Sequence, residues 1–274
     1  MKIPGLSIAA YTPSLIKALS TAEVGALTTQ ELQGLTSTQL NSLSNTQIQA
    51  IQADRISSIN NLNSLLIDKI VALTENQIQG LSTNQLSNLT SAQVGALTTK
   101  EIQALTTAQA AALTTGFVTA LTGAQLGKLN TADLAALKTE AVAALKSTQV
   151  QGLSTAQIQA LTTQQAAQLS TSTLAALSAS QLSAMETQDL AQISSASIRS
   201  LNPKALAALT TAQFTALGAD TLNALGTSQV TALTSAQIQA LTTEQVASLQ
   251  TDQTVALSAT QLKALTTDQI VSLT

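Results

Sequence analysis

The sequence predicts an all-α solenoid of very short helices, with one helix in each eight-residue repeat and several helices in each superhelical turn. Two observations favour this fold. A leucine recurs every eight residues without slippage from Leu65 to Leu273, and only Met185 and Ile193 replace it. A hydroxyl residue usually follows this leucine, and a glutamine stands three residues after the hydroxyl, as in LTTEQVAS at 241–248. We call this repeat an octad and number its positions 1 to 8 from the leucine.

An eight-residue period fits neither a continuous helix nor a strand. Eight residues advance an α-helix by about 800°, so the apolar positions would drift by roughly 80° in each octad. In a strand, positions 1 and 6 would face opposite sides of the pleat. A short helix that restarts in every octad satisfies the pattern, and we expect each to contain about six or seven residues.

Each octad carries the signals of a helix start. Position 2 is predicted to be the N-cap and position 5 the third helical residue, so that Ser or Thr and Gln or Glu form a capping box. Pro13 and Pro203 stand at position 3, the first helical residue, where proline is accepted. All 14 acidic residues stand at positions 2 to 5, near the positive end of each helix dipole.

Positions 1 and 6 are predicted to form the core, as Leu241 and Val246 illustrate. Position 8 is usually Ala or Gly, which lets the next backbone approach closely. Helices this short are unstable alone, so neighbouring octads must stabilise them. Phe214 stands at position 6 and is expected in the core, whereas Phe117 replaces the glutamine of position 5 and is expected to be exposed.

Counting octads divides the chain into atypical capping repeats at 1–18, octads at 19–58, a register break at 59–66 and octads at 67–274. At the break, the first positions Ile59 and Leu65 are only six residues apart. Leu66 and Ile67 stand where nearly every other octad has a polar residue. The break predicts either a kink or contact surface in the stack, or a deletion that a turn absorbs.

The two ends of the chain differ in pattern. The first octads depart from the repeat and are interpreted as a cap, whereas the last octads stay in register with no polar cap. We therefore expect an open apolar stacking surface at the C-terminal end. The candidate assembly contacts at the break and at the two ends are Leu62, Leu66, Ile67, Leu265, Ile270, Leu273, Ile3 and Tyr11.

The composition excludes several kinds of site. The chain contains no His and no Cys, so the usual nucleophile–base pairs and thiolate metal sites lack candidates. We expect no enzyme activity, no cofactor and no metal site. The net charge of −3 provides no basic field for nucleic acid. No apolar run approaches the roughly 18 residues that span a bilayer, and the N-terminus is a poor secretory signal.

The octads ALTTAQAAAL, GLSTAQIQAL and ALTSAQIQAL resemble the Leu/Ala/Thr/Gln short-repeat tracts of large secreted or surface proteins of bacteria. The resemblance covers nearly the whole chain and implies no transferable activity. The composition, without Cys or Trp and rich in Ala, Thr, Gln, Ser and Asn, is also similar to that of flagellin-like secreted filament proteins.

Three functions stay open from the sequence. The first is a structural protein that associates with itself into an extracellular filament or surface assembly. The second is an adhesin-type binding module for a peptide, a glycan or a surface. The third is ice binding through regularly spaced threonines such as Thr98, Thr106 and Thr114. The expected location is extracellular or at the cell surface, with the cytoplasm as the alternative.

Overall fold

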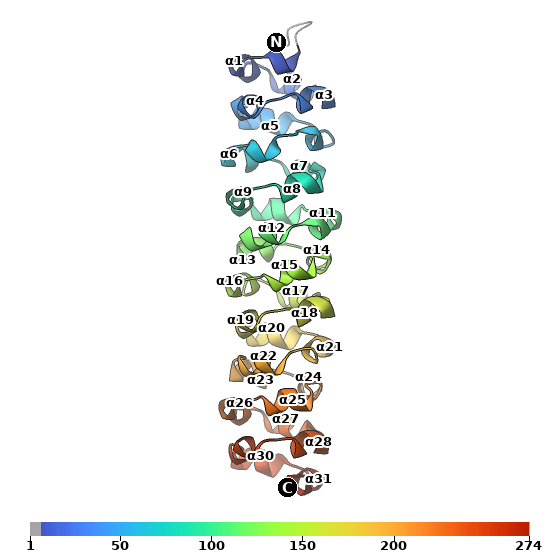
Figure 1. The fold of residues 1–274 in the computed structure, drawn as a ribbon, viewed down its shortest axis with the longest axis vertical. Helices are drawn as coiled ribbons and strands as arrows, with labels where there is room; N and C mark the ends of the chain where they lie inside the picture. The colour runs from blue at the N-terminus through green and yellow to red at the C-terminus, as the bar shows by residue number, and fades with distance from the viewer. Residues whose placement is uncertain (1–6, 274) are drawn as a thin grey trace. The chain divides into compact units, whose positions relative to one another are not determined.

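The computed structural model describes residues 7–273, and these form 31 short α-helices, three 3₁₀ helices and no strand (Figure 1). The chain divides into two compact units, residues 1–138 and residues 139–274. Within the described residues each unit is a solenoid of short helices, which confirms the predicted fold class. Ile3, one of the candidate assembly contacts, lies outside the described residues.

The helices of the first unit are η1 (Ile8–Ala10), α1 (Pro13–Lys17), α2 (Thr21–Gly25), α3 (Thr29–Gln33), α4 (Ser37–Ser42), α5 (Asn45–Ala50), η2 (Ile56–Ser58), η3 (Leu62–Ser64), α6 (Ile67–Ile70), α7 (Glu75–Gly80), α8 (Thr83–Ser87), α9 (Ser91–Ala96), α10 (Thr99–Gln103), α11 (Thr107–Ala112), α12 (Thr115–Ala120), α13 (Gly123–Leu126) and α14 (Thr131–Ala136).

The helices of the second unit are α15 (Thr139–Ala143), α16 (Ser147–Val150), α17 (Thr155–Gln159), α18 (Thr163–Ala167), α19 (Thr171–Ala175), α20 (Ala179–Ala184), α21 (Thr187–Leu190), α22 (Ser195–Arg199), α23 (Pro203–Ala207), α24 (Thr211–Thr215), α25 (Ala219–Asn223), α26 (Thr227–Ala232), α27 (Ser235–Ala240), α28 (Thr243–Ala247), α29 (Thr251–Val255), α30 (Ala259–Ala264) and α31 (Thr267–Val271).

The helices start and stop where the octad predicts. In α27 the Thr234 side chain accepts a hydrogen bond from the backbone N–H of Gln237 at 3.2 Å, which caps the helix start. Leu241 then has φ −59° and ψ 142°, an extended conformation that ends the helix. The α-helices contain 4 to 6 residues, so many are shorter than the six or seven residues expected, because the residues next to the leucine at position 1 belong to the caps.

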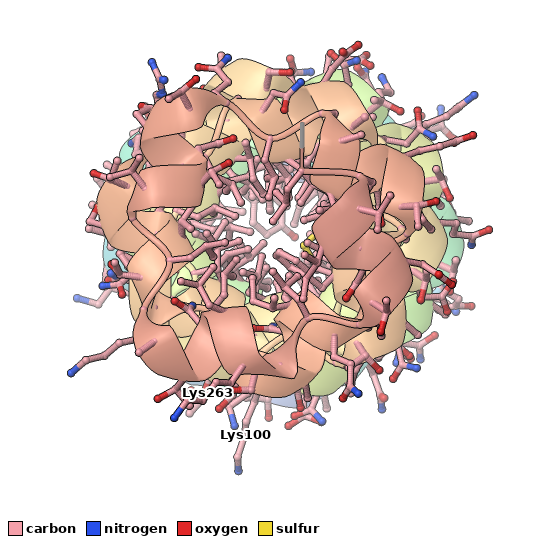
Figure 2. All side chains as sticks on the ribbon, turned by 90° about the horizontal axis from the view of Figure 1, so that it is seen from below. Lys100 and Lys263 are labelled. Carbon is pink, nitrogen blue, oxygen red and sulfur yellow. The ribbon has the colours of Figure 1, made fainter. Side chains whose placement is uncertain are left out.

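Positions 1 and 6 form the core of both units. Leu209, Phe214 and Leu217 in the second unit are almost fully buried, and the same positions in the first unit are equally covered. Each helix packs mainly on the helix three places further along the chain, as α2 does on α5 and α17 on α20. In Figure 2 the side chains that point inward are mostly carbon, whereas Lys263 points outward.

The register break in the first unit is absorbed by tight turns. The octads around Ile56 and Leu62 form the 3₁₀ helices η2 and η3 in place of α-helices, and both side chains stay buried. A 3₁₀ helix rises more steeply for each residue than an α-helix, so fewer residues span the same path. The buried core therefore continues through the break, although the outer surface changes there.

Gly80 allows a close backbone approach at this break. A Cβ added at Gly80 would lie 2.0 Å from the carbonyl oxygen of Ala53, whereas a Cβ at Gly218 would meet nothing within 4 Å. Because main chain must move to relieve this overlap, we expect Gly80→Ala to lower the free energy of unfolding by about 1–3 kcal/mol. The control is Gly218→Ala, and urea unfolding measures the free energy of unfolding of both variants. An equal effect of the two substitutions would contradict the prediction.

Candidate functional site

The glutamine of position 5 makes hydrogen bonds in two directions. In α27, Gln237 is only 1% exposed, and its Oε1 accepts the backbone N–H of Thr234 at 2.9 Å. Its Nε2 donates to the carbonyl oxygens of Leu206 and Leu209, at 2.9 Å each. These carbonyls belong to the C-terminal end of α23. One side chain therefore caps the start of its own helix and the end of a helix in the preceding turn.

This arrangement recurs in both units. The amide Nε2 donates to main-chain carbonyl oxygens 26 to 31 residues earlier in the chain, most often 28 and 31 residues earlier. A separation of 28 residues equals three and a half octads, so a superhelical turn contains between three and four helices. The glutamines with these bonds include Gln39, Gln47, Gln77, Gln85, Gln93, Gln109, Gln125, Gln181, Gln213, Gln229, Gln237, Gln245, Gln253, Gln261 and Gln269.

The same cross-turn bonds show how the register break is tolerated. Gln77 and Gln85 reach carbonyls 26 and 29 residues earlier, two residues fewer than usual, because the short octad lies between. Arg55 stands at position 5 and donates from its guanidinium to the carbonyl of Leu27 at 2.9 Å, 28 residues earlier. The main-chain carbonyls next to the break therefore keep donors although the octad is shortened.

Other residues at position 5 are also buried. Thr173 donates from its hydroxyl to the carbonyl of Leu145 at 3.0 Å. Phe117 is 3% exposed, which corrects the expectation that it faces solvent. The physical reason is that position 5 points toward the preceding turn, so a residue there is covered where such a turn packs against it, whereas Leu15 at the same position near the start of the first unit is 37% exposed. Phe214, at position 6, is buried as expected.

Three of the five acids at position 5 are buried, and their surroundings differ. Asp133 is satisfied, because Thr107 donates to its Oδ1 at 2.6 Å and Asn130 donates to its Oδ2. Among the described residues, Glu101 Oε1 and both carboxylate oxygens of Asp189 have no hydrogen-bond partner. Burial raises the pKa of Asp189. The hydroxyl of Thr163 lowers this pKa to a smaller extent, and the negative charge of Glu186 raises it.

The candidate assembly contacts fall into two groups. Leu66, Ile67 and Ile270 are exposed, at 57%, 47% and 55%, and Leu273 is half-buried. Tyr11, Leu62 and Leu265 are buried within the described chain. Tyr11 and Leu265 stand at position 1, which points inward, and Leu62 replaces the position 6 core residue in the shortened octad.

The structure adds three exposed valines that the sequence analysis did not single out. Val71, Val255 and Val271 all stand at position 7, which is otherwise small or polar, and their exposed fractions are 38%, 79% and 70%. A large aliphatic residue at position 7 is the sequence signal that could have identified these exposed valines. Val71 extends the exposed pair Leu66 and Ile67 on α6, and the other two lie on α29 and α31. We call Leu66, Ile67 and Val71 the α6 patch.

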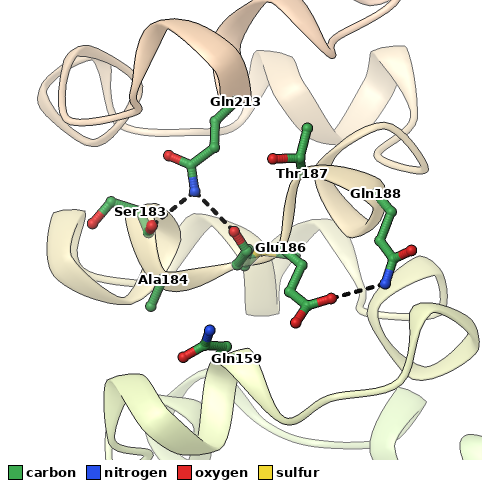
Figure 3. A pocket seen from close by; sticks show the side chains of 8 residues that line it. Gln159, Ser183, Ala184, Glu186, Thr187, Gln188 and Gln213 are labelled. Carbon is green, nitrogen blue, oxygen red and sulfur yellow. Dashed lines mark hydrogen bonds between the residues drawn. The ribbon is translucent and has the colours of Figure 1, made fainter.

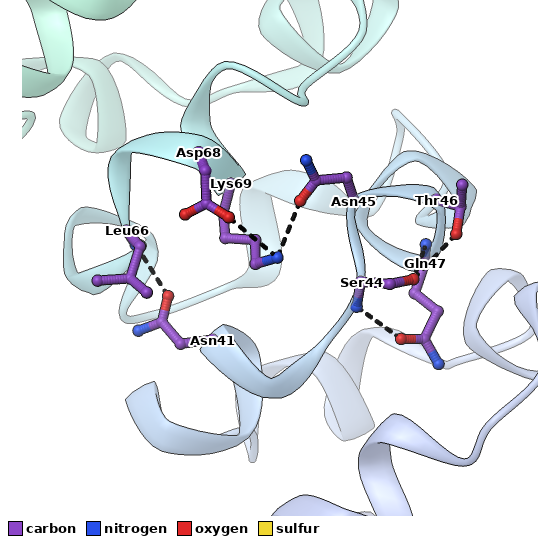
Figure 4. Close-up of polar contacts among 8 residues, drawn as sticks. All are labelled: Asn41, Ser44, Asn45, Thr46, Gln47, Leu66, Asp68 and Lys69. Atoms are coloured by element: carbon purple, nitrogen blue, oxygen red, sulfur yellow. Dashed lines mark hydrogen bonds and ion pairs between the residues drawn. The ribbon is translucent and has the colours of Figure 1, made fainter.

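Polar contacts from the preceding turn support the α6 patch (Figure 4). Leu66 occupies the N-cap of α6 and has no hydroxyl, so it makes no side-chain cap. Its backbone N–H instead donates to Asn41 Oδ1 at 2.8 Å. Lys69 donates to Asn45 Oδ1 at 2.8 Å and lies 3.2 Å from the carboxylate of Asp68. The exposed leucine therefore sits on an anchored backbone.

A polar hollow of about 670 Å³ lies between turns of the second unit (Figure 3). Gln213 closes one side by donating to the carbonyls of Ser183 and Met185, at 2.8 Å each. Gln188 donates to the carboxylate of Glu186 at 2.8 Å, and Gln159 lines the opposite wall. The lining offers amides and hydroxyls but only one carboxylate, which is hydrogen-bonded, so it provides no acid–base pair.

Among the described residues there is neither a cluster suited to a metal ion nor a helix suited to span a membrane. Residues 7–273 contain no group of three or more His, Cys, Asp or Glu placed to hold a metal ion. In this same part of the chain, the helices are too short and too polar for any of them to cross a membrane.

Comparison with known proteins points to a repeat family. The family described as ALTTAQ repeat matches residues 68–99, 126–163, 182–219 and 219–251, which together make up just over half of the chain. No curated protein matches the chain. The family match agrees with the resemblance drawn from the octads.

Proposed function

Because the chain belongs to the ALTTAQ repeat family and is a structural repeat protein, we propose that it associates with itself into an extracellular filament or surface layer. The role is non-enzymatic in this proposal, and the partner is a second copy of the chain. The observation that carries it is the exposure of large aliphatic side chains in two places, the α6 patch in the first unit and α29 to α31 in the second. Clustered apolar exposure of this kind marks interaction surfaces.

The exposed positions on α30 and α31 are of the kind that a neighbouring turn of octads covers elsewhere in the second unit. Leu262 and Ile270 stand at position 6, and in earlier octads of the same unit this position is covered by the following turn, as Val230 and Ile238 are. The surface that fits them is therefore another turn of octads. The low net charge of −3 on 274 residues opposes association only weakly.

A glycan-binding adhesin is less well supported. Sugar-binding and interface hot spots commonly use exposed aromatic side chains. The chain has one tyrosine and two phenylalanines, and Tyr11, Phe117 and Phe214 are all buried. Self-association needs only the aliphatic surfaces that the structure exposes.

Light scattering coupled to size-exclusion chromatography over a range of concentrations tests the proposal. We expect the mass to rise with concentration, and to rise less in Val255→Thr/Val271→Thr, which keeps the side-chain shape but removes the apolar surface. Gln239→Ser, an exposed change on α27, is the matched control. A monomer at every concentration would contradict self-association. Surface labelling of intact cells tests the proposed location.

Leu66→Thr is expected to separate stability from association at the α6 patch. Threonine would supply the missing N-cap hydroxyl of α6, so the free energy of unfolding should rise by about 1 kcal/mol. The same change removes the most exposed apolar side chain of the patch and should weaken association. Thermal unfolding and light scattering measure the two effects, and a less stable variant would contradict the assignment of Leu66 as the N-cap.

A further inference from the structure

We propose that Glu101, when protonated, donates a hydrogen bond from Oε1 to a main-chain carbonyl oxygen of the preceding turn, that of Ile70 or Leu73. This proton-dependent hydrogen bond would replace the hydrogen bonds that the side-chain amide of glutamine donates in other octads. It would make the contact between α10 and the turn below it sensitive to pH. The inference does not depend on self-association.

The first support is the geometry of the flanking octads. Gln93 Nε2 donates to the carbonyls of Asn63 and Leu65, at 3.0 and 2.8 Å. Gln109 Nε2 donates to the carbonyls of Ile78 and Leu81, at 2.8 Å each, which lie 31 and 28 residues earlier. The same separations from Glu101 lead to Ile70 and Leu73.

The second support is the state of the two carboxyl oxygens. Glutamate has the same side-chain length as glutamine, and Glu101 Oε2 accepts the backbone N–H of Thr98 at 2.5 Å, as a glutamine Oε1 does elsewhere. The other oxygen, Oε1, therefore occupies the place of Nε2. It is buried and lacks a hydrogen-bond partner among the described residues, and the whole residue is 3% exposed. An ionised oxygen beside carbonyl oxygens is repelled, whereas a protonated one can donate.

The third support is the charge around Glu101. It shares a hollow of about 420 Å³ with Glu75 at the start of α7 and with Lys100 on α10 itself. Figure 2 shows Lys100 extending away from the protein. The other helix packed on α10 is α13, with the sequence GAQL, which has no charged residue. On α6, Asp68 and Lys69 lie 3.2 Å apart and face each other.

These surroundings favour the neutral form. Burial raises the pKa of Glu101, hydrogen bonding to Thr98 lowers it to a smaller extent, and the carboxylate of Glu75 raises it. A pKa that is higher in the folded than in the unfolded state means that the folded state binds more protons. Stability is therefore lost as the pH rises from the unfolded value of about 4.5 through the folded pKa.

Carboxyl ¹³C NMR of the full chain tests the proposal directly. We expect one glutamate carboxyl resonance to keep its protonated shift at pH values where the others have ionised, and to disappear in Glu101→Gln. Titration of every glutamate in its ordinary range would overturn the proposal. Glu244→Gln is the control, because Glu244 is exposed at position 4 of its octad, next to an intact Gln245.

Thermal unfolding gives an independent readout. Glu101→Gln places the usual residue at position 5, so the variant is expected to fold. Between pH 5 and pH 8 the unfolding midpoint of the original chain should fall by about 2–4 °C more than that of Glu101→Gln. Glu244→Gln should follow the original chain. Equal pH dependence of the original chain and Glu101→Gln would overturn the proposal.

Discussion

Replacing Gln237 by leucine is expected to lower the free energy of unfolding by roughly 3–5 kcal/mol. The change keeps an apolar side chain of similar size but removes three hydrogen bonds at a position that is 1% exposed. The backbone N–H of Thr234 and the carbonyls of Leu206 and Leu209 would then be left without this partner. Each buried polar group that loses its partner costs about 1–3 kcal/mol.

The matched control is Gln239→Leu, two residues later on the same helix. Gln239 is exposed at position 7, so its replacement should change the free energy of unfolding by no more than about 0.5 kcal/mol. Urea unfolding monitored by circular dichroism measures both variants. If the two substitutions had similar effects, the buried glutamine would not connect successive turns.

Replacing Phe214 by alanine is expected to lower the free energy of unfolding by about 3–5 kcal/mol. Phe214 lies on α24 at position 6 of its octad and is fully buried, and the core at this point consists otherwise of aliphatic side chains such as Leu217. Its removal leaves a cavity, because helices of 4 to 6 residues that are anchored at both ends by caps can collapse only slightly.

Phe214→Leu separates the cavity from the loss of aromatic character. Leucine is the usual residue at position 6 in neighbouring octads, as at Leu206 and Leu222, so this variant should lose less than about 1.5 kcal/mol. Differential scanning calorimetry of the two variants provides the comparison. An equally large loss in Phe214→Leu would mean that the cavity is not the cause.

The octad predicts the local structure well. The hydroxyl of position 2 and the glutamine of position 5 are three residues apart, so their capping box follows from the sequence, and Pro13 and Pro203 start helices as predicted. The inward direction of positions 1 and 6 follows from the same placement of the helix within the octad. These features depend only on residues within one octad.

The contacts between turns could not be predicted in the same way. Which carbonyl a glutamine such as Gln237 reaches depends on how many octads complete a superhelical turn, and an eight-residue period does not specify that number. The burial of Phe117 and Glu101 was missed for the same reason, because position 5 faces the preceding turn. Tyr11 and Leu62 were named as candidate assembly contacts because they lie at the chain end and at the register break, and their places in the octads direct both side chains to the core.

Exchange of glutamine side-chain amide protons, followed by NMR, tests most directly whether position 5 connects successive turns. Gln237 and Gln239 lie on the same helix α27, but only Gln237 is buried and bonded to the turn before it. We predict that the Nε2 protons of Gln237 exchange many times more slowly than those of Gln239. Equal exchange rates for the two side chains would contradict the cross-turn bonds on which the fold described above depends.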